Sequence, residues 1–178
     1  DWSRVLIQWV DERLLSRHHP NSNSELIESV LLSRHQAAVS QWHNVLPEVT
    51  GAPRELTDVE QQAVLQAALE RYQEPDIVVL GMGEDGHTAS LFPHAKQLPQ
   101  ALNLHNTAPL MLLQDVVAPY ASISMTLPAI LSAKVIFIAA YGQQKREVLQ
   151  QAAKQLDANL PISSVFHHAQ KIPVYVYC

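Results

Sequence analysis

Cysteine is nearly absent from this 178-residue chain, whose only thiol is the final residue, Cys178. A single cysteine cannot form a disulfide within the chain, which is usual for proteins of a reducing compartment. The sequence also has no apolar run approaching the roughly 18 residues that cross a bilayer, and its start lacks the basic and apolar regions of a secretory signal. These absences predict a cytoplasmic protein with no membrane partner.

Long blocks of like charge are missing as well. The 12 basic and 17 acidic residues give a formal net charge of −5 and are spread along the chain. Because nucleic-acid-binding proteins usually carry a concentrated basic surface, we expect no nucleic-acid partner. An anionic ligand must instead be held by a few local groups. The composition leaves the oligomeric state open.

Hydrophobic residues make up 47% of the chain and charged residues 16%. A chain of this length lies within the size range of one globular domain and can bury a substantial core. No internal repeat or low-complexity tract divides it. We therefore expect residues 1–178 to form a single domain.

Short apolar runs alternate with helical patterns along the sequence. Apolar and β-branched runs predict strands at residues 5–10, 77–80, 135–140 and 174–177. Capping residues and apolar stripes predict helices at residues 22–31, 57–72, 126–132 and 144–156. Residues 97–120 follow no clear pattern. The alternation predicts an α/β fold with a mostly parallel sheet flanked by helices in a Rossmann-like, three-layer architecture.

Polar segments follow three of the predicted strands, at residues 11–13, 81–87 and 141–145. In folds of this class, ligands bind beyond the carboxyl ends of the parallel strands. We therefore expect these three segments to meet at one edge of the sheet and to form the functional site.

Residues 81–86 read GMGEDG and match G-x-G-x-x-G directly after a predicted strand. A dinucleotide-binding turn should open a helix of ten or more residues, with an acidic residue about twenty positions further on. Here Pro93 falls seven residues after Gly86, and the next acidic residue is Asp115. The glycine pattern therefore does not favour a dinucleotide-binding site.

The same glycine-rich segment carries Asp85 and His87. Glycine lets the backbone approach a ligand closely, and backbone N–H groups can then face an anion or a developing oxyanion. A histidine beside a carboxylate is suited to general-base catalysis, because the carboxylate orients the ring and stabilises the imidazolium. Two interpretations stay open on these residues alone. Either Asp85 orients a catalytic base, or it caps a short helix starting near Thr88 against which His87 packs.

The remaining histidines do not favour a metal site. They include two adjacent pairs and one isolated residue: His18 with His19, His167 with His168, and His94. The sequence has no H-E-x-x-H motif and no cysteine pair, and it lacks the G-x-S-x-G turn of serine hydrolases. We expect neither a metal nor a nucleophilic serine.

The segment GMGEDGHTASLFP at residues 81–93 resembles the signature of the 6-phosphogluconolactonase family, which is close to G-M-G-x-D-G-H-T-A-S-L-F-P. Two further blocks agree in order. WVDER at 9–13 with NSN at 21–23 resembles the family's D-E-R…S-N segment, and TLP at 126–128 with GQQK at 142–145 resembles its T-L-P…G-x-x-K segment. The match covers most of the chain and is weak over 44–72 and 97–117.

The resemblance implies hydrolysis of 6-phospho-D-glucono-1,5-lactone to 6-phospho-D-gluconate in the pentose phosphate pathway, without a cofactor. It implies that His87 removes a proton from water and that Asp85 orients it. The expected partner is a small phosphorylated sugar lactone. The residues expected to bind it are Asp11, Glu12, Arg13, Asn23, Gly83, Gly86 and Lys145. For the two cations in this set, solvated surface charges remain the alternative interpretation.

The chain also departs from the family pattern. Members usually carry a further amino-terminal segment with a serine-glycine-glycine phosphate loop, so the domain is expected to lack that segment. Ser122 stands where the family commonly has arginine. Two other functions therefore stay open: a non-enzymatic sugar-phosphate-binding domain, and an isomerase resembling glucosamine-6-phosphate deaminase. The deaminase family typically has N-G-H-I-A where this chain has DGHTA at 85–89, and D-E-Y where Arg13 stands.

Overall fold

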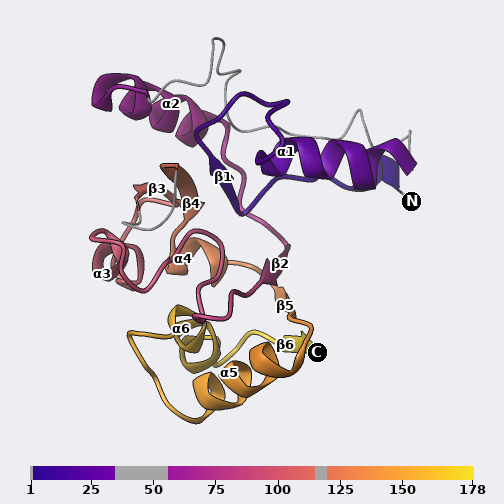
Figure 1. Ribbon diagram of the computed structural model, residues 1–178, viewed down its shortest axis with the longest axis vertical. Helices are drawn as coiled ribbons and strands as arrows, with labels where there is room; N and C mark the ends of the chain where they lie inside the picture. The colour runs from indigo at the N-terminus through magenta and orange to yellow at the C-terminus, as the bar shows by residue number, and fades with distance from the viewer. Residues whose placement is uncertain (1, 35–55, 115–119) are drawn as a thin grey trace.

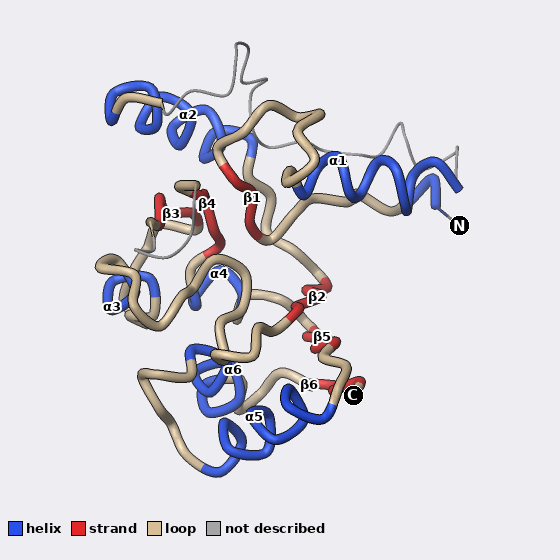
Figure 2. The backbone as a smooth tube through the Cα atoms, in the orientation of Figure 1, coloured by secondary structure: helices blue, strands red, loops and turns tan. Residues whose placement is uncertain are grey.

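The computed structural model describes residues 2–34, 56–114 and 120–178. The described residues form two three-stranded sheets, with the strand orders β1-β4-β3 and β2-β5-β6. Figures 1 and 2 show both sheets and the helices around them. The strands are β1 (Asp11–Arg13), β2 (Ile77–Gly81), β3 (Leu110–Leu113), β4 (Ser122–Met125), β5 (Val135–Ala139) and β6 (Val174–Tyr177).

The α-helices are α1 (Asn23–Leu26), α2 (Asp58–Arg71), α3 (Leu98–Ala101), α4 (Leu127–Ile130), α5 (Gln143–Lys154) and α6 (Pro161–His168). Residues Ile27–Leu31 continue α1 as a π-helical turn, η2. The 3-10 helices are η1 (Trp2–Arg4) and η3 (Leu32–Arg34). Within the described ranges, no helix has the length and apolar character needed to cross a membrane.

Two predicted helix starts are confirmed by their capping bonds. Ser22 accepts a hydrogen bond from the N–H of Glu25 at the start of α1. At the start of α2, Thr57 and Glu60 form a reciprocal capping box. Such caps satisfy N–H groups that have no partner within the helix, so these two starts could be located from the sequence.

The predicted strands at 77–80, 135–140 and 174–177 are confirmed as β2, β5 and β6, which run parallel. Alternate side chains of β2 and β5 are at most 1% exposed: Val78, Leu80, Ile136 and Ile138. On the opposite face of β2, Ile77 and Val79 are 58% and 61% exposed. Only one face of this strand therefore packs into the core.

The expectation of a mostly parallel sheet is met only in part. β1 and β3 both pair antiparallel with β4, and the Rossmann-like, three-layer arrangement stays a prediction. The strand predicted at 5–10 is wrong, because the strand is formed by the next three residues, Asp11–Arg13. The strand lies at Asp11–Arg13 because these residues pair with β4. A local apolar pattern cannot predict such a long-range partner.

The register of the parallel sheet brings two expected segments to one edge. Gly81 on β2 pairs with Ala139 on β5, and Ala139 pairs in turn with Tyr177 on β6. The glycine-rich segment after β2 and the start of α5 after β5 therefore leave the sheet at its carboxyl edge. Helices α5 and α6 pack against each other.

Candidate functional site

His87 and Asp85 form a close pair in the loop after β2. Nδ1 of the His87 ring lies 2.6 Å from Oδ1 of Asp85, and the His87 backbone N–H donates to the same oxygen at 3.1 Å. Because an ionised carboxylate only accepts hydrogen bonds, we assign the proton to Nδ1, which leaves Nε2 of the neutral ring as an acceptor. The ring also packs on Phe92 with centroids 4.4 Å apart.

The protonation state of Asp85 is fixed by the same contacts. Burial acts to raise the pKa of Asp85, but the N–H of His87, the imidazole charge and the ring hydrogen bond outweigh it and hold the pKa below its usual value. Asp85 is therefore ionised at neutral pH and can orient the His87 ring.

The capping interpretation of Asp85 is wrong. Residues 82–97 contain no helix, and α3 begins only at Leu98. Thr88 instead forms an isolated β-bridge with Leu91, and its hydroxyl donates to the carbonyl of Gly81 at 2.8 Å. The same absence of a helix after the glycines rules out the phosphate-binding turn of a dinucleotide fold.

Gly83 and Gly86 shape the loop that carries His87. A Cβ atom on Gly83 would overlap the His87 ring and lie 2.5 Å from Oδ1 of Asp85. Gly86 has a φ of +76°, and a Cβ atom there would lie 2.7 Å from Leu160. The N–H of Gly83 donates to the carbonyl of His87 at 2.9 Å, and that of Gly86 to the carbonyl of Gly83 at 3.1 Å. Both N–H groups are thus engaged within the loop, and the glycines serve its shape.

The backbone turns left-handed at Ala89, where φ is +47°. This conformation costs a residue with a side chain about 1–2 kcal/mol, so surrounding contacts must hold it. Beyond the turn, the hydroxyl of Ser90 donates to Oδ2 of Asp11 at 2.6 Å. Sequence reasoning did not assign Ser90 a role of its own, and its place in the signature segment was the one signal available.

Asp11 joins the loop to the antiparallel sheet. It lies on β1, and Nδ2 of Asn23 donates to its backbone carbonyl at 2.7 Å and to Oδ1 at 3.3 Å. Burial raises the pKa of Asp11, while the Ser90 hydroxyl and the charges of Arg13 and His87 act to lower it. Asp11 thus interacts electrostatically with both the candidate base and a candidate substrate-binding cation.

Arg13 lies two residues further along β1 and is half-buried. Its Nη1 donates to Oδ1 of Asn23 at 2.8 Å and to the carbonyl of Asn21 at 3.0 Å. Both bonds use one end of the guanidinium, which carries five N–H donors in all. Ser122 faces Arg13 directly across the β1–β4 pair and is buried. In this cross-strand pair, the positive charge comes from Arg13 on β1, because the facing residue on β4 is a serine.

Glu12 is buried, with 2% of its surface exposed. Its Oε1 accepts from the N–H groups of Arg13 and Asn23, each at 2.8 Å. Its Oε2 accepts from the hydroxyls of Ser22 and Ser24 and from the N–H of Ser24, at 2.7–3.0 Å. Charged groups are buried only when such partners surround them. Glu12 therefore holds the start of α1 against β1 and keeps Asn23 beside Arg13.

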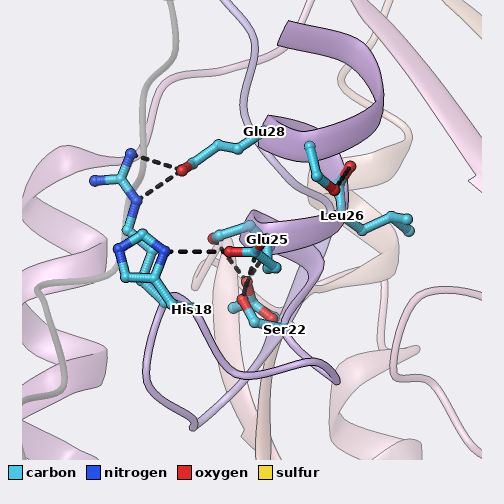
Figure 3. Close-up of polar contacts among 9 residues, drawn as sticks. His18, Ser22, Glu25, Leu26 and Glu28 are labelled. Carbon is cyan, nitrogen blue, oxygen red and sulfur yellow. Dashed lines mark hydrogen bonds and ion pairs between the residues drawn. The ribbon is translucent and has the colours of Figure 1, made fainter. Parts of the chain in front are cut away.

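Two side-chain contacts join the segment after β1 to α1 and η2. Nδ1 of His18 lies 3.1 Å from Oε2 of Glu25, and Nη2 of Arg17 lies 2.6 Å from Oε1 of Glu28. Figure 3 shows the contact between His18 and Glu25. Figure 3 also shows Ser22 at the start of the helix, next to Glu25. Both contacts reach the helical segment that begins at Asn23, the residue that accepts a hydrogen bond from Arg13.

Lys145 lies in the first turn of α5 and is half-buried. It shares the carboxyl edge of the parallel sheet with the His87 loop. Among the described residues, no polar contact joins it to His87, Asp85 or Arg13, so its contact with a ligand stays a prediction. Within the same ranges, no group of three histidine, cysteine or acidic side chains could hold a metal ion.

Taken together, the fold and the contacts define an α/β protein whose candidate site lies where the carboxyl edge of a parallel sheet meets a second, antiparallel sheet. A histidine–carboxylate pair comes from the first sheet and an arginine from the second. Such an arrangement suits general-base chemistry on an anionic ligand.

Comparison with known proteins identifies the family. The sequence model of the glucosamine-6-phosphate isomerases/6-phosphogluconolactonase family matches residues 1–174. A 6-phosphogluconolactonase of Neisseria meningitidis is 38% identical over 168 residues, which are 94% of this chain and 71% of that protein. The chain belongs to this family.

Solved structures agree with this assignment. The crystal structure of a Neisseria gonorrhoeae FA 1090 protein aligns with a TM-score of 0.89 at 37% identity, over 99% of this chain and 74% of that chain. A 6-phosphogluconolactonase from Shewanella baltica OS155 aligns with a TM-score of 0.81 at 32% identity, over 99% and 72% of the two chains.

Proposed function

We propose that this protein hydrolyses 6-phospho-D-glucono-1,5-lactone to 6-phospho-D-gluconate, a step of the pentose phosphate pathway. Family membership gives the substrate class, because the N. meningitidis and S. baltica relatives are 6-phosphogluconolactonases. The observation that carries the proposal is the 2.6 Å contact between His87 and Asp85 within the signature segment. This contact supports a general base, His87, whose ring is oriented by the carboxylate of Asp85.

His87 is the base in this proposal. Its Nε2 takes a proton from a water molecule, whose oxygen forms a bond to C1 of the lactone. Asp85 holds Nδ1–H and stabilises the imidazolium that results. When the bond between C1 and the ring oxygen breaks, the ring oxygen receives the proton from Nε2. The product acid then loses its own proton to solvent, so the enzyme returns to its starting state.

Arg13, Asn23 and Lys145 are the proposed substrate-binding side chains. Arg13 has donors beyond the Nη1 group that holds Asn23 and Asn21, and guanidinium groups bind phosphate and carboxylate through paired bonds. Lys145 supplies a second cation, at the carboxyl edge of the parallel sheet that also carries the His87 loop. Hydrogen bonds link Asp11 to the His87 loop through Ser90 and to Arg13 through Asn23. Glu12 holds the start of α1, and with it Asn23, against β1. Gly83 and Gly86 act through the shape of the loop.

We also propose that residues 1–178 form one sugar-phosphate hydrolase domain, completed by additional chain of the kind that makes its relatives longer. This chain spans 71% of the N. meningitidis protein. A cleft of about 970 Å³ runs between residues 4–10, the helical turns α1 and η2, and the start of β2. Parallel sheets are normally covered on both faces, so the exposed side chains of β2 in this cleft support the proposal.

The decisive experiment follows acid release from freshly prepared 6-phosphogluconolactone and compares it with the spontaneous rate. We expect release to exceed that background in proportion to enzyme concentration. Glucosamine-6-phosphate is tested in parallel for ammonia release. Ammonia release without lactone hydrolysis would favour the isomerase alternative over the proposal. Binding of 6-phosphogluconate without turnover of either compound would favour a non-enzymatic binding domain.

A further inference from the structure

Ser90 contacts both members of one residue pair in the antiparallel sheet. Its hydroxyl donates to Oδ2 of Asp11 at 2.6 Å, and its N–H donates to the hydroxyl of Ser124 at 3.2 Å. Asp11 and Ser124 are direct partners across β1 and β4. Ser90 is itself 2% exposed. Through Ser90, the loop that carries His87 is therefore hydrogen-bonded to both residues of the register pair Asp11–Ser124.

We propose that Ser90 is a positioning residue for the lactonase reaction, one that fixes the His87 loop relative to the strand that carries Arg13. This inference rests on the proposed function. Ser90 follows His87 by three residues, and Asp11 precedes Arg13 by two. The bond between Ser90 and Asp11 thus closes a short connection between the base and the cation, although its two ends lie 79 residues apart in the sequence.

The connection continues beyond Asp11 through side chains. Nδ2 of Asn23 donates to Oδ1 of Asp11 at 3.3 Å, and Oδ1 of Asn23 accepts from Arg13 at 2.8 Å. Ser90, Asp11, Asn23 and Arg13 therefore form one continuous set of hydrogen bonds. Loss of the Ser90 hydroxyl removes the bond that ties this set to the His87 loop.

The left-handed turn at Ala89 must be held by surrounding contacts, and the bonds of Ser90 are among them. Ala89 lies between His87 and Ser90 and has a φ of +47°, a conformation that residues with a side chain adopt only when other contacts impose it. The bonds made by Ser90 lie immediately after the turn. Without them the turn can relax, and a shift of about 1 Å at a catalytic group can lower a rate on the order of 100-fold.

Ser163 provides the matched control for a role in stability alone. It is fully buried, and its hydroxyl accepts from the N–H and donates to the carbonyl of Asp157, each at 2.9 Å. Ser163→Ala therefore removes a buried serine hydroxyl with two partners from α6, outside the candidate site. If the Ser90 hydroxyl contributed to stability alone, Ser90→Ala should have the same effects as Ser163→Ala.

The test compares Ser90→Ala, Ser90→Thr and Ser163→Ala with the parent. For Ser90→Ala we expect kcat to fall about 10- to 100-fold with KM within a few-fold of the parent. We also expect the NMR signals of the His87 ring, assigned with His87→Ala, to shift or split. Ser90→Thr, which keeps the hydroxyl, should recover most of kcat. Ser163→Ala should lower the melting temperature but leave both kcat and the ring signals unchanged. Should Ser90→Ala not fold, Ser90→Cys takes its place, because its slightly larger sulfur fills the site but donates only a weak hydrogen bond.

The inference is overturned if Ser90→Ala keeps parental kcat and ring signals, or if Ser163→Ala lowers kcat equally. Either result leaves the proposed function intact, because the parent still hydrolyses the lactone. A parent without activity above the spontaneous rate would instead refute the proposed function. The ring signals of Ser90→Ala and Ser163→Ala would then decide the positioning role by themselves.

Discussion

The ring of His87 occupies the space that a side chain on Gly83 would need. A Cβ atom at Gly83 would overlap Cε1 and Nδ1 of this ring and approach Oδ1 of Asp85 to 2.5 Å. The N–H of Gly83 also donates to the carbonyl of His87 at 2.9 Å. The base can therefore rest directly on the backbone of the loop only because residue 83 has no side chain.

Gly83→Ala should abolish most lactonase activity. The added methyl group must displace either the His87 ring or Asp85, and we expect kcat to fall on the order of 100-fold. Gly81→Ala, at the end of β2 just before the loop, is the control, since a Cβ atom there meets nothing within 4 Å. Steady-state kinetics of the two variants check this prediction. Equal activity would mean that the ring position is not needed.

His87→Ala should separate catalysis from packing. Loss of a general base typically lowers a rate by about 10²–10⁴-fold, so we expect a fall of that size in kcat with 6-phosphogluconate affinity within a few-fold of the parent. His94→Ala, at an exposed histidine seven positions further on, should retain parental activity. If His87→Ala kept near-parental catalysis, His87 would not be the base, and a neighbouring carboxylate would become the leading candidate.

Asp11→Asn should raise the melting temperature at neutral pH while lowering activity. Burial raises the pKa of Asp11 above its ordinary value of 3.8, so the ionised group opposes folding at a pH above its folded-state pKa. This cost is lost as the pH falls through the raised pKa towards 3.8. The stability gain from Asn should therefore shrink over that window. Glu84→Gln, at an exposed carboxylate, should show no such trend in pH-dependent thermal melts.

Gly86→Ala should destabilise the fold more than Gly142→Ala does. Both glycines have positive φ, +76° and +107°, but only at Gly86 would a Cβ atom meet a neighbour, Leu160 at 2.7 Å. Both variants carry a backbone penalty, and at Gly142, with φ +107° and ψ +155°, the backbone lies in a region essentially restricted to glycine. A greater loss at Gly86 therefore gives a lower bound on the cost of the clash. Urea unfolding gives both free energies. A loss at Gly86 no greater than that at Gly142 would contradict this prediction.

The antiparallel sheet could not be derived from the sequence pattern. The charged triplet Asp11–Arg13 reads as the solvent end of a strand, yet it forms the strand itself and buries Glu12. Five hydrogen-bond donors make that burial tolerable, and they come from Arg13 and from residues 22–24. Local patterns do not encode such partners, because the folded chain supplies them.

The sequence by itself determined the local features of this protein. Alternating and continuous apolar runs located β2, β5 and β6, capping residues located the starts of α1 and α2, and the segment at 81–93 placed Asp85 and His87 in one loop. These features depend on neighbours within a few residues. Tertiary structure alone decided that Ser90 would meet Asp11 and that Asn23 would hold Arg13. Those contacts join segments from different sheets, and only the packing of the whole chain brings them within hydrogen-bonding distance.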